Sequence, residues 1–288
     1  MGIIDFILNL AAVLLWLNWL SSRLDPMAQR KPATLMGTLR PAAPPSPRHR
    51  AWLLVILALL TVRAWLYCQL GPSLAPGWTG QVNFGTVILA FSCRGGWLGL
   101  ERMLLFSFLS FGVMLGVVYL WLILLSLLKG PDAIHRLVRV SLGRVDGWPG
   151  WAKILVPWLL VFGGWILLTW LLTSLKIIPR PISPAQRIEQ AAVIGCGAFL
   201  VWKYVLGALL SLYLLNTYVY LGSSALWKYV NVTADTLLAP LRHLPFGLGE
   251  MLRVGKVDFA PVAAVGVIFL SAQLIGNSLI WLYQHLPF

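Results

Sequence analysis

The sequence predicts an all-α fold: a polytopic membrane helix bundle of about six transmembrane helices, with amphipathic segments at the membrane surface. Three observations support this prediction. Only 11% of the 288 residues are charged and 59% are hydrophobic, whereas a soluble domain is about 25% charged. The chain holds 15 tryptophans, a residue that gathers at membrane interfaces. Apolar runs of about 20 residues, the length that spans a bilayer as a helix, recur along the chain.

Six apolar runs are candidates for membrane spans. The first lacks a positive amino-terminal region and a small-residue cleavage site, so we expect a retained helix rather than a secretory signal. The fifth is longer than a bilayer requires, so its first turns are expected to lie on the surface or the helix to tilt. The runs cover residues 3–20, 51–70, 103–128, 152–175, part of 191–221, and 260–283.

The loops predict the orientation of the chain. If the amino terminus lies outside, the inner loops 21–50, 129–150 and 222–259 hold six, four and four Lys or Arg residues, and the outer loops 71–102 and 175–189 hold two and three. Because basic residues collect on the cytoplasmic side, both termini are predicted to be extracytoplasmic. The net charge of +13 is then explained by loops that touch anionic lipid headgroups. No nucleic-acid motif is present, so no nucleic-acid partner is expected.

Three further features leave alternatives open. The segment Gly80–Phe91 is too short to span, and its partial alternation fits either a strand or an interfacial segment. Arg63 and Lys203 lie inside apolar runs, where charge is costly. Each side chain either extends to the outer interface or forms part of a polar pathway through the bundle.

Two loops resemble each other, which indicates an internal repeat. Gly143-Arg-Val-Asp146-Gly-Trp-Pro149 matches Gly255-Lys-Val-Asp258-Phe-Ala-Pro261. Upstream of these, Asp132 to Arg139 matches Asp235 to Arg242 in spacing. Each copy lies between two predicted spans, on the same predicted face of the membrane, so the repeats are parallel.

The shared Asp-x-x-Pro pattern is interpreted in two ways. Asp146 and Asp258 can cap helices that enter the membrane, because Asp is a strong N-cap and Pro149 and Pro261 are tolerated in a first turn. Alternatively, the two aspartates form an ion or proton site together with the arginines of the repeat, Arg139 and Arg242. Before the second copy, residues 229–244 have helical apolar spacing and predict an amphipathic surface helix that Pro240 kinks or breaks. Residues 133–142 are the expected counterpart.

These residues resemble the YggT family of small membrane proteins. Two segments carry the resemblance: Thr236-Leu-Leu-Ala-Pro240-Leu-Arg242, and the Gly-Lys-Val-Asp-Phe-Ala-Pro run 255–261 before an apolar helix. Ala260 replaces the family's usual Ser. The match is good over 200–285, weaker over 103–175, and does not cover 1–102. We therefore divide the chain into two amino-terminal helices with their loops (1–102), a first YggT-like unit (103–175) and a second (176–288).

The resemblance implies roles in osmotic stress, cell division or assembly, including haem attachment in plastid relatives. The sequence contains no metalloprotease, phosphate-binding, hydrolase or dinucleotide motif, so no catalytic residue, cofactor or metal is predicted. We expect a non-enzymatic scaffold or assembly protein with a membrane-protein partner or a homo-oligomer. An ion channel or transporter subunit is the alternative, and a haem handler using His135 or His243 is a minor one.

Overall fold

A computed structural model describes residues 2–24, 48–74, 78–92, 97–128, 138–139, 141–178, 183–219, 225–242, 253–254 and 257–285. The chain packs as two compact units. One consists of residues 1–82 and 88–116, and the other of 83–87 and 117–288. The division falls inside one continuous helix, α3 (Trp97–Leu127), and at the tip of a hairpin.

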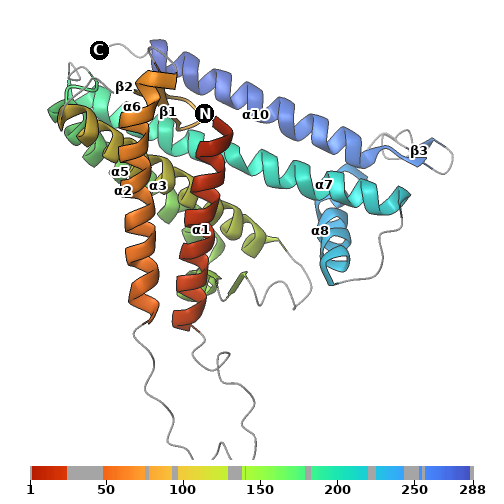
Figure 1. Cartoon of the computed structure of the whole chain (residues 1–288). Coiled ribbons are helices and arrows are strands. Elements are labelled where there is room, and N and C mark those ends of the chain that lie inside the picture. The colour runs from red at the N-terminus through yellow and green to blue at the C-terminus, as the bar shows by residue number, and fades with distance from the viewer. Residues whose placement is uncertain are drawn as a thin grey trace, which may run out of the picture. The chain divides into compact units, whose positions relative to one another are not determined.

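The first unit is built from three helices. α1 (Gly2–Leu24) and α2 (Arg48–Leu74) lie side by side (Figure 1), and α3 (Trp97–Leu127) contributes its first part. Both α1 and α2 are apolar almost all round, which is typical of a helix whose outer surface faces lipid. Their inner surfaces bury small and aliphatic side chains, including Ala12, Val13 and Leu60.

A short hairpin completes the first unit. β1 (Thr79–Asn83) pairs with β2 (Ile88–Ser92), so most of Gly80–Phe91 is in strands. Alternate residues are buried, and Phe91 packs 5.8 Å from the ring of Phe106 on α3. Gly80 faces the same ring: a Cβ there would lie 2.9 Å from it. A glycine therefore allows β1 to lie flat on Phe106.

The second unit holds the other three spans. α5 (Gly150–Ser174) packs against α6 (Pro184–Ala198), and α7 (Trp202–Tyr218) packs against α10 (Ala260–His285). Small residues permit these close approaches, as is common between helices in membranes. A Cβ at Gly195 would lie 3.0 Å from the indole nitrogen of Trp158, and one at Gly207 would lie 2.8 Å from the ring of Phe269.

The fifth apolar run is a continuous helical segment with a short 3-10 turn inside it. α6 passes through the 3-10 turn η3 (Phe199–Val201) into α7, and the whole segment is 35 residues long. Two reciprocal hydrogen bonds fix this turn to α3. The Trp121 indole donates to the Val201 carbonyl at 3.2 Å, and the Trp202 indole donates to the Leu120 carbonyl at 3.0 Å. Neighbouring side chains thus bond to backbone carbonyls at a change of helix type.

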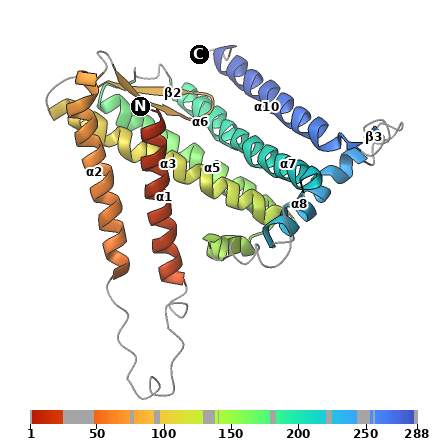
Figure 2. The same ribbon diagram turned by 45° about the vertical axis from the view of Figure 1, so that its right-hand side comes forward.

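The predicted amphipathic surface helix is α8 (Ala225–Arg242), which continues through Pro240. It lies against α7 and α10 near the place where α7 ends and α10 begins (Figure 2). Its buried side, with Ala234 and Leu238, joins Leu210 of α7 and Ala264 of α10 in one apolar cluster. The expected counterpart, residues 133–142, falls partly outside the described residues. Its helical residues Val138 and Leu142 pack on the end of α3.

The tip of the β1–β2 hairpin belongs to the second unit. The Gly85 amide donates to the Asn83 side chain at 2.7 Å, and Gly85 has φ of +89°, a conformation that favours glycine. Thr86 packs on Gly197 of α6, where an added Cβ would lie 2.8 Å from its methyl group. Thr86 at the tip therefore packs where Gly197 has no side chain.

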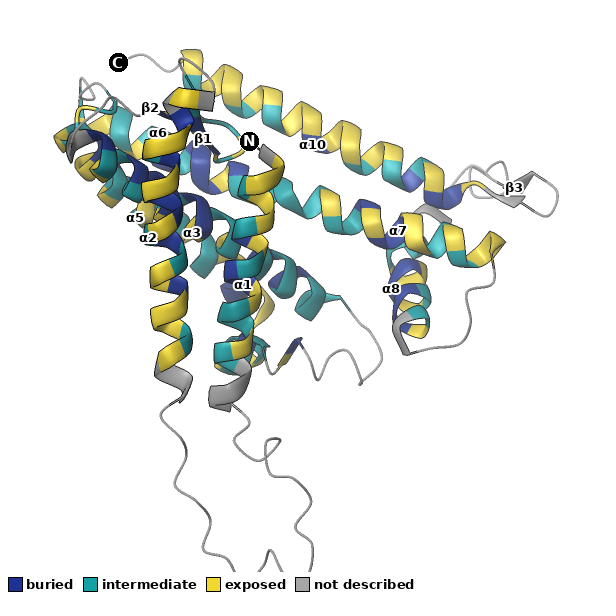
Figure 3. Ribbon diagram, in the orientation of Figure 1, coloured by how far each residue is buried: buried dark blue, intermediate teal, exposed yellow. Residues whose placement is uncertain are grey.

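Six helical segments among the described residues are long and apolar enough to cross a membrane. They match the six spans predicted from the sequence, so the chain is an all-α, multi-pass membrane helix bundle. Exposed apolar residues run along most of the spans, and α10 is mostly exposed (Figure 3).

Candidate functional site

Polar side chains from α1, α2 and α3 meet in a closed hydrogen-bonded ring inside the first unit. Arg63 donates through Nη2 to Oδ1 of Asp5 at 2.5 Å and through Nη1 to Oδ1 of Asn9 at 2.6 Å. The Asn9 amide donates to the Ser110 hydroxyl at 2.8 Å, and this hydroxyl donates to Oδ2 of Asp5 at 3.5 Å. We call these four residues the Arg63 ring.

Aromatic groups enclose the Arg63 ring. The guanidinium carbon lies 5.3 Å from the ring centroid of Phe106 and 5.6 Å from that of Tyr67. The Tyr67 hydroxyl also donates to Oδ1 of Asp5 at 3.3 Å. Among the described side-chain nitrogen and oxygen atoms of the Arg63 ring, Nε of Arg63 is the one that is buried without a hydrogen-bond partner. The positive charge is thus balanced by a carboxylate and by the faces of two aromatic rings.

The expectation that Arg63 extends to the outer interface is wrong. Its side chain is only 1% exposed, while that of Asp5 is 21% exposed. The carboxylate of Asp5 reaches the guanidinium from a neighbouring helix, so the arginine is neutralised where it stands. No local pattern in the sequence indicates this pairing, since the two residues lie 58 positions apart. Asn9, one helical turn after Asp5, was the only local indication of a polar face on α1.

Asp146 of the first repeat loop joins two basic residues. Its carboxylate lies 3.3 Å from Nε of Arg139 and 3.8 Å from Nζ of Lys153. Asp146 and Arg139, two of the four residues considered for an ion or proton site, therefore form an ion pair. Lys153, on the first turn of α5, was missed. It is buried, with its side chain 8% exposed, whereas that of Arg139 is 73% exposed.

Asp146 does not cap α5, contrary to the capping prediction. It lies in the short 3-10 helix η2 (Gly143–Gly147), and Pro149 is the N-cap of α5, without a side-chain cap bond. The carboxylate is directed to Arg139 and Lys153 instead. Pro149 has an extended backbone, with φ −62° and ψ 152°, which suits an N-cap position.

The second repeat loop has a different local structure. Asp258 lies in β4 (Val257–Asp258), which pairs antiparallel with β3 (Arg253–Val254). α10 begins two residues later, and the Ala263 amide donates to the Phe259 carbonyl at 3.0 Å. Phe259 thus occupies the capping position predicted for Asp258, and Pro261 is the second residue of α10.

Of the remaining predicted site residues, some have side chains that the structure does not describe. Arg242 is the last residue of α8, and its side chain, like that of Asp258, lies outside the described residues. An ion or proton site shared by both repeats therefore stays a prediction. Lys203 is half-buried near the start of α7, with its amine 5.1 Å from the ring centroid of Tyr204. His135 and His243 also lie outside the described residues.

The buried side of α8 carries two hydroxyl groups. Tyr229 and Thr233 are one helical turn apart and buried, and neither hydroxyl has a hydrogen-bond partner among the described residues. Burial raises the pKa of the Tyr229 hydroxyl, and the nearby Thr233 hydroxyl opposes that rise. The exposed side of α8 includes Asp235 and Lys228.

Comparisons of the chain with protein-family models, curated proteins and solved structures gave no match. Among the described residues, no group of three His, Cys, Asp or Glu side chains is placed to hold a metal ion. The geometry supports charge pairing between helices and loops. The buried Arg63 lies beside Asp5 in the Arg63 ring, and the buried Lys153 lies beside Asp146 of the first repeat loop.

Proposed function

We propose that this chain is a non-catalytic membrane scaffold or assembly protein that acts through contacts of its helices with other proteins and with lipid. The exposure of the spans carries the proposal. Only 11% of the most apolar window of α10, and the same share for α5, is buried within the chain. Such surfaces need lipid or another helix as their partner, and a scaffold offers them to one.

The proposal includes membership of the YggT family, with the amino and carboxyl termini outside a bacterial inner membrane. The arrangement of α7, α8 and α10 supports it: span, surface helix and span, as the resemblance implies. The basic loops of the predicted cytoplasmic side are suited to anionic headgroups. Roles in osmotic stress or complex assembly agree with this architecture.

Extraction of the protein from its native membrane in a mild detergent tests the proposal. A tagged chain should recover a partner at fixed stoichiometry or a homo-oligomer. A monomer without any partner, seen in several detergents and in lipid nanodiscs, would refute the scaffold function. Binding of the chain to vesicles with and without anionic lipid is the companion measurement for the basic loops.

A channel or transporter subunit is the second candidate, and the Arg63 ring favours it. Polar residues inside membrane helices frequently mark transport pathways. Reconstituted vesicles distinguish the two candidates. Transport requires an ion flux that falls when Asn9→Leu opens the ring or when Asp258→Ala removes the second repeat carboxylate. A flux that is absent, or unchanged by these variants while the protein stays folded, leaves the ring a structural device.

A further inference from the structure

One row of residues along α10 is left unused by the packing of the chain itself. Its members are spaced alternately by four and three positions and all are exposed: Gly266, Leu270, Gln273, Asn277, Ile280 and Gln284. We call this set the amide row. The side of α10 that packs on α7 and α8 carries other residues, such as Ala264 and Ala272, which are buried.

The amide row does not suit lipid as its only neighbour. Gln273 and Asn277 lie in the middle of the 26-residue span, and their side chains form no hydrogen bond within the described residues. Hydrocarbon offers no partner to an amide, and an unsatisfied polar group there is costly. The serines of the same stretch differ, because Ser271 and Ser278 donate to carbonyls of their own helix at 3.1 and 2.8 Å.

We infer that a second copy of this chain covers the amide row, in a parallel dimer of α10 with α10 about a two-fold axis. The four–three spacing is that of the seam between two helices of a left-handed coiled coil. In a parallel two-fold pair each seam residue meets its own counterpart. An amide both donates and accepts, so Gln273 and Asn277 satisfy themselves across such an axis.

Two details favour the parallel dimer over other arrangements. In coiled coils, an Asn at one seam position fixes the register and the number of helices that associate. Asn277 occupies such a position, and Gln273 occupies the seam position before it. Gly266 has open space where its Cβ would be, so a partner backbone can approach closely at the start of the seam. A parallel pair also keeps both copies in the same membrane topology, which an antiparallel pair would not.

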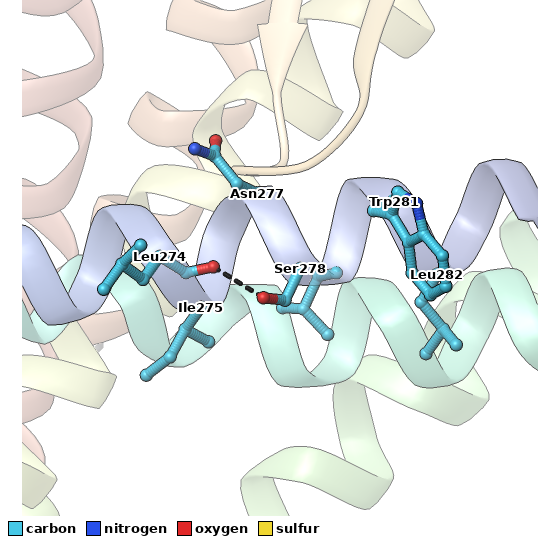
Figure 4. A pocket seen from close by; sticks show the side chains of 7 residues that line it. Leu274, Ile275, Asn277, Ser278, Trp281 and Leu282 are labelled. Atoms are coloured by element: carbon cyan, nitrogen blue, oxygen red, sulfur yellow. Dashed lines mark hydrogen bonds between the residues drawn. The ribbon is translucent and has the colours of Figure 1, made fainter.

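An open groove of about 740 Å³ flanks the amide row and is lined by Leu274, Asn277, Ser278, Trp281 and their neighbours (Figure 4). Leu274 and Trp281 each follow a seam residue by one position and border the seam. A partner helix packed on the amide row reaches this groove at Asn277, whereas Ile275, which also lines the groove, lies on the other side of α10 from the row. Figure 4 also shows Ile275 pointing away from Asn277, which makes it a matched control at the same depth in the span.

This inference rests on the proposed scaffold function and names its partner. The first test is disulfide cross-linking of the full chain in native membranes, with Cys68, Cys93 and Cys196 replaced by serine. Asn277→Cys should give a covalent dimer, and Ile275→Cys should not. Cross-linking from Ile275→Cys at least as strong as from Asn277→Cys would overturn the inference, and so would an adduct of Asn277→Cys with a different protein.

The second test needs no cysteine replacement. Chains fused to donor or acceptor fluorescent proteins are diluted in liposomes, and association is followed by energy transfer. Because interhelical hydrogen bonds change association by roughly threefold to twentyfold each, the variant Gln273→Leu/Asn277→Leu should associate about tenfold more weakly or worse. Ser271→Ala is the control and should leave association unchanged.

The two tests separate this inference from the function on which it rests. Dimers that withstand the double amide change, or that cross-link elsewhere, contradict the amide row but keep a scaffold. Cross-linking of a different protein to Asn277→Cys likewise contradicts the dimer and keeps a scaffold. A chain that stays monomeric at every dilution and recovers no partner contradicts both.

Discussion

Removal of the Asp5 carboxylate should destabilise the protein far more than removal of the arginine it neutralises. Asp5→Leu leaves Arg63, which is 1% exposed, as a buried cation without a counter-ion. It also removes the acceptor of three donors: Arg63, Tyr67 at 3.3 Å and Ser110 at 3.5 Å. Breaking a buried ion pair from one side costs about 3–5 kcal/mol. We expect about 3 kcal/mol, the lower end of this range, since the Asp5 side chain is 21% exposed and the pair is only partly enclosed.

The reverse change should be milder. Arg63→Leu leaves a carboxylate that is partly exposed and keeps the Tyr67 and Ser110 donors, so about 1–2 kcal/mol is expected. The double variant Asp5→Leu/Arg63→Leu has no buried charge left. Replacement of a whole buried pair by apolar groups is often close to neutral. The double variant should therefore be more stable than Asp5→Leu alone.

The assay is unfolding of the purified chain by SDS in mixed micelles, followed by tryptophan fluorescence and circular dichroism. A double-mutant cycle extracts the coupling between the two residues. Single costs of about 3 and 1–2 kcal/mol with a near-neutral double variant give an expected coupling of about 4–5 kcal/mol. If the double variant is no more stable than Asp5→Leu, or if Asp5→Leu costs less than about 1 kcal/mol, the carboxylate does not hold the arginine in place and the account of the ring is refuted.

Three further outcomes can be checked with the same assay. Gly197→Ala should cost about 1–3 kcal/mol because its Cβ would meet Thr86 at 2.8 Å. The control Gly163→Ala, whose Cβ enters open space, should be neutral or stabilising by up to about 1 kcal/mol. Equal effects of the two changes would contradict the packing of the hairpin tip on Gly197. Trp202→Phe should lose about 1 kcal/mol with its bond to the α3 backbone, and an unchanged midpoint would show that this bond is dispensable. Burial raises the pKa of the Tyr229 hydroxyl in the folded chain, whereas in the unfolded chain this pKa is about 10. The neutral hydroxyl therefore contributes its full stabilisation below about pH 10. This stabilisation is lost as the pH rises from the unfolded pKa toward the folded pKa. Tyr229→Phe should then gain on the wild type only above about pH 10, and a difference that is constant with pH would exclude this titration.

The spans of this fold were predictable because each is a local property of the chain. Twenty apolar residues in a row have few other places to go, and the structure returns the same six segments. The partial alternation of Gly80–Phe91 left a strand and an interfacial segment open, and apolar spacing indicated α8. The 3-10 break at Phe199–Val201 was not predictable. It depends on Trp121 and Trp202 reaching backbone carbonyls about 80 positions away.

The sites were harder to predict because charge pairing is decided in three dimensions. Asp5 appeared only as an acid near the start of an apolar run, and nothing local links it to Arg63. Asp146 has a strong intrinsic tendency to cap a helix. Two cations, Arg139 and the buried Lys153, take its carboxylate instead, and charge-assisted contacts are stronger than a single cap bond.

We propose that the exposed spans contact another protein chain, and a count of the chains in each particle tests this proposal. Native mass spectrometry of the protein in nanodiscs drawn from its own membrane, without a cross-linker, counts the chains. We predict an oligomer or a complex of fixed stoichiometry, with a dimer the expected form where only this chain is present. Particles that hold one copy of this chain and no other protein would contradict the claim.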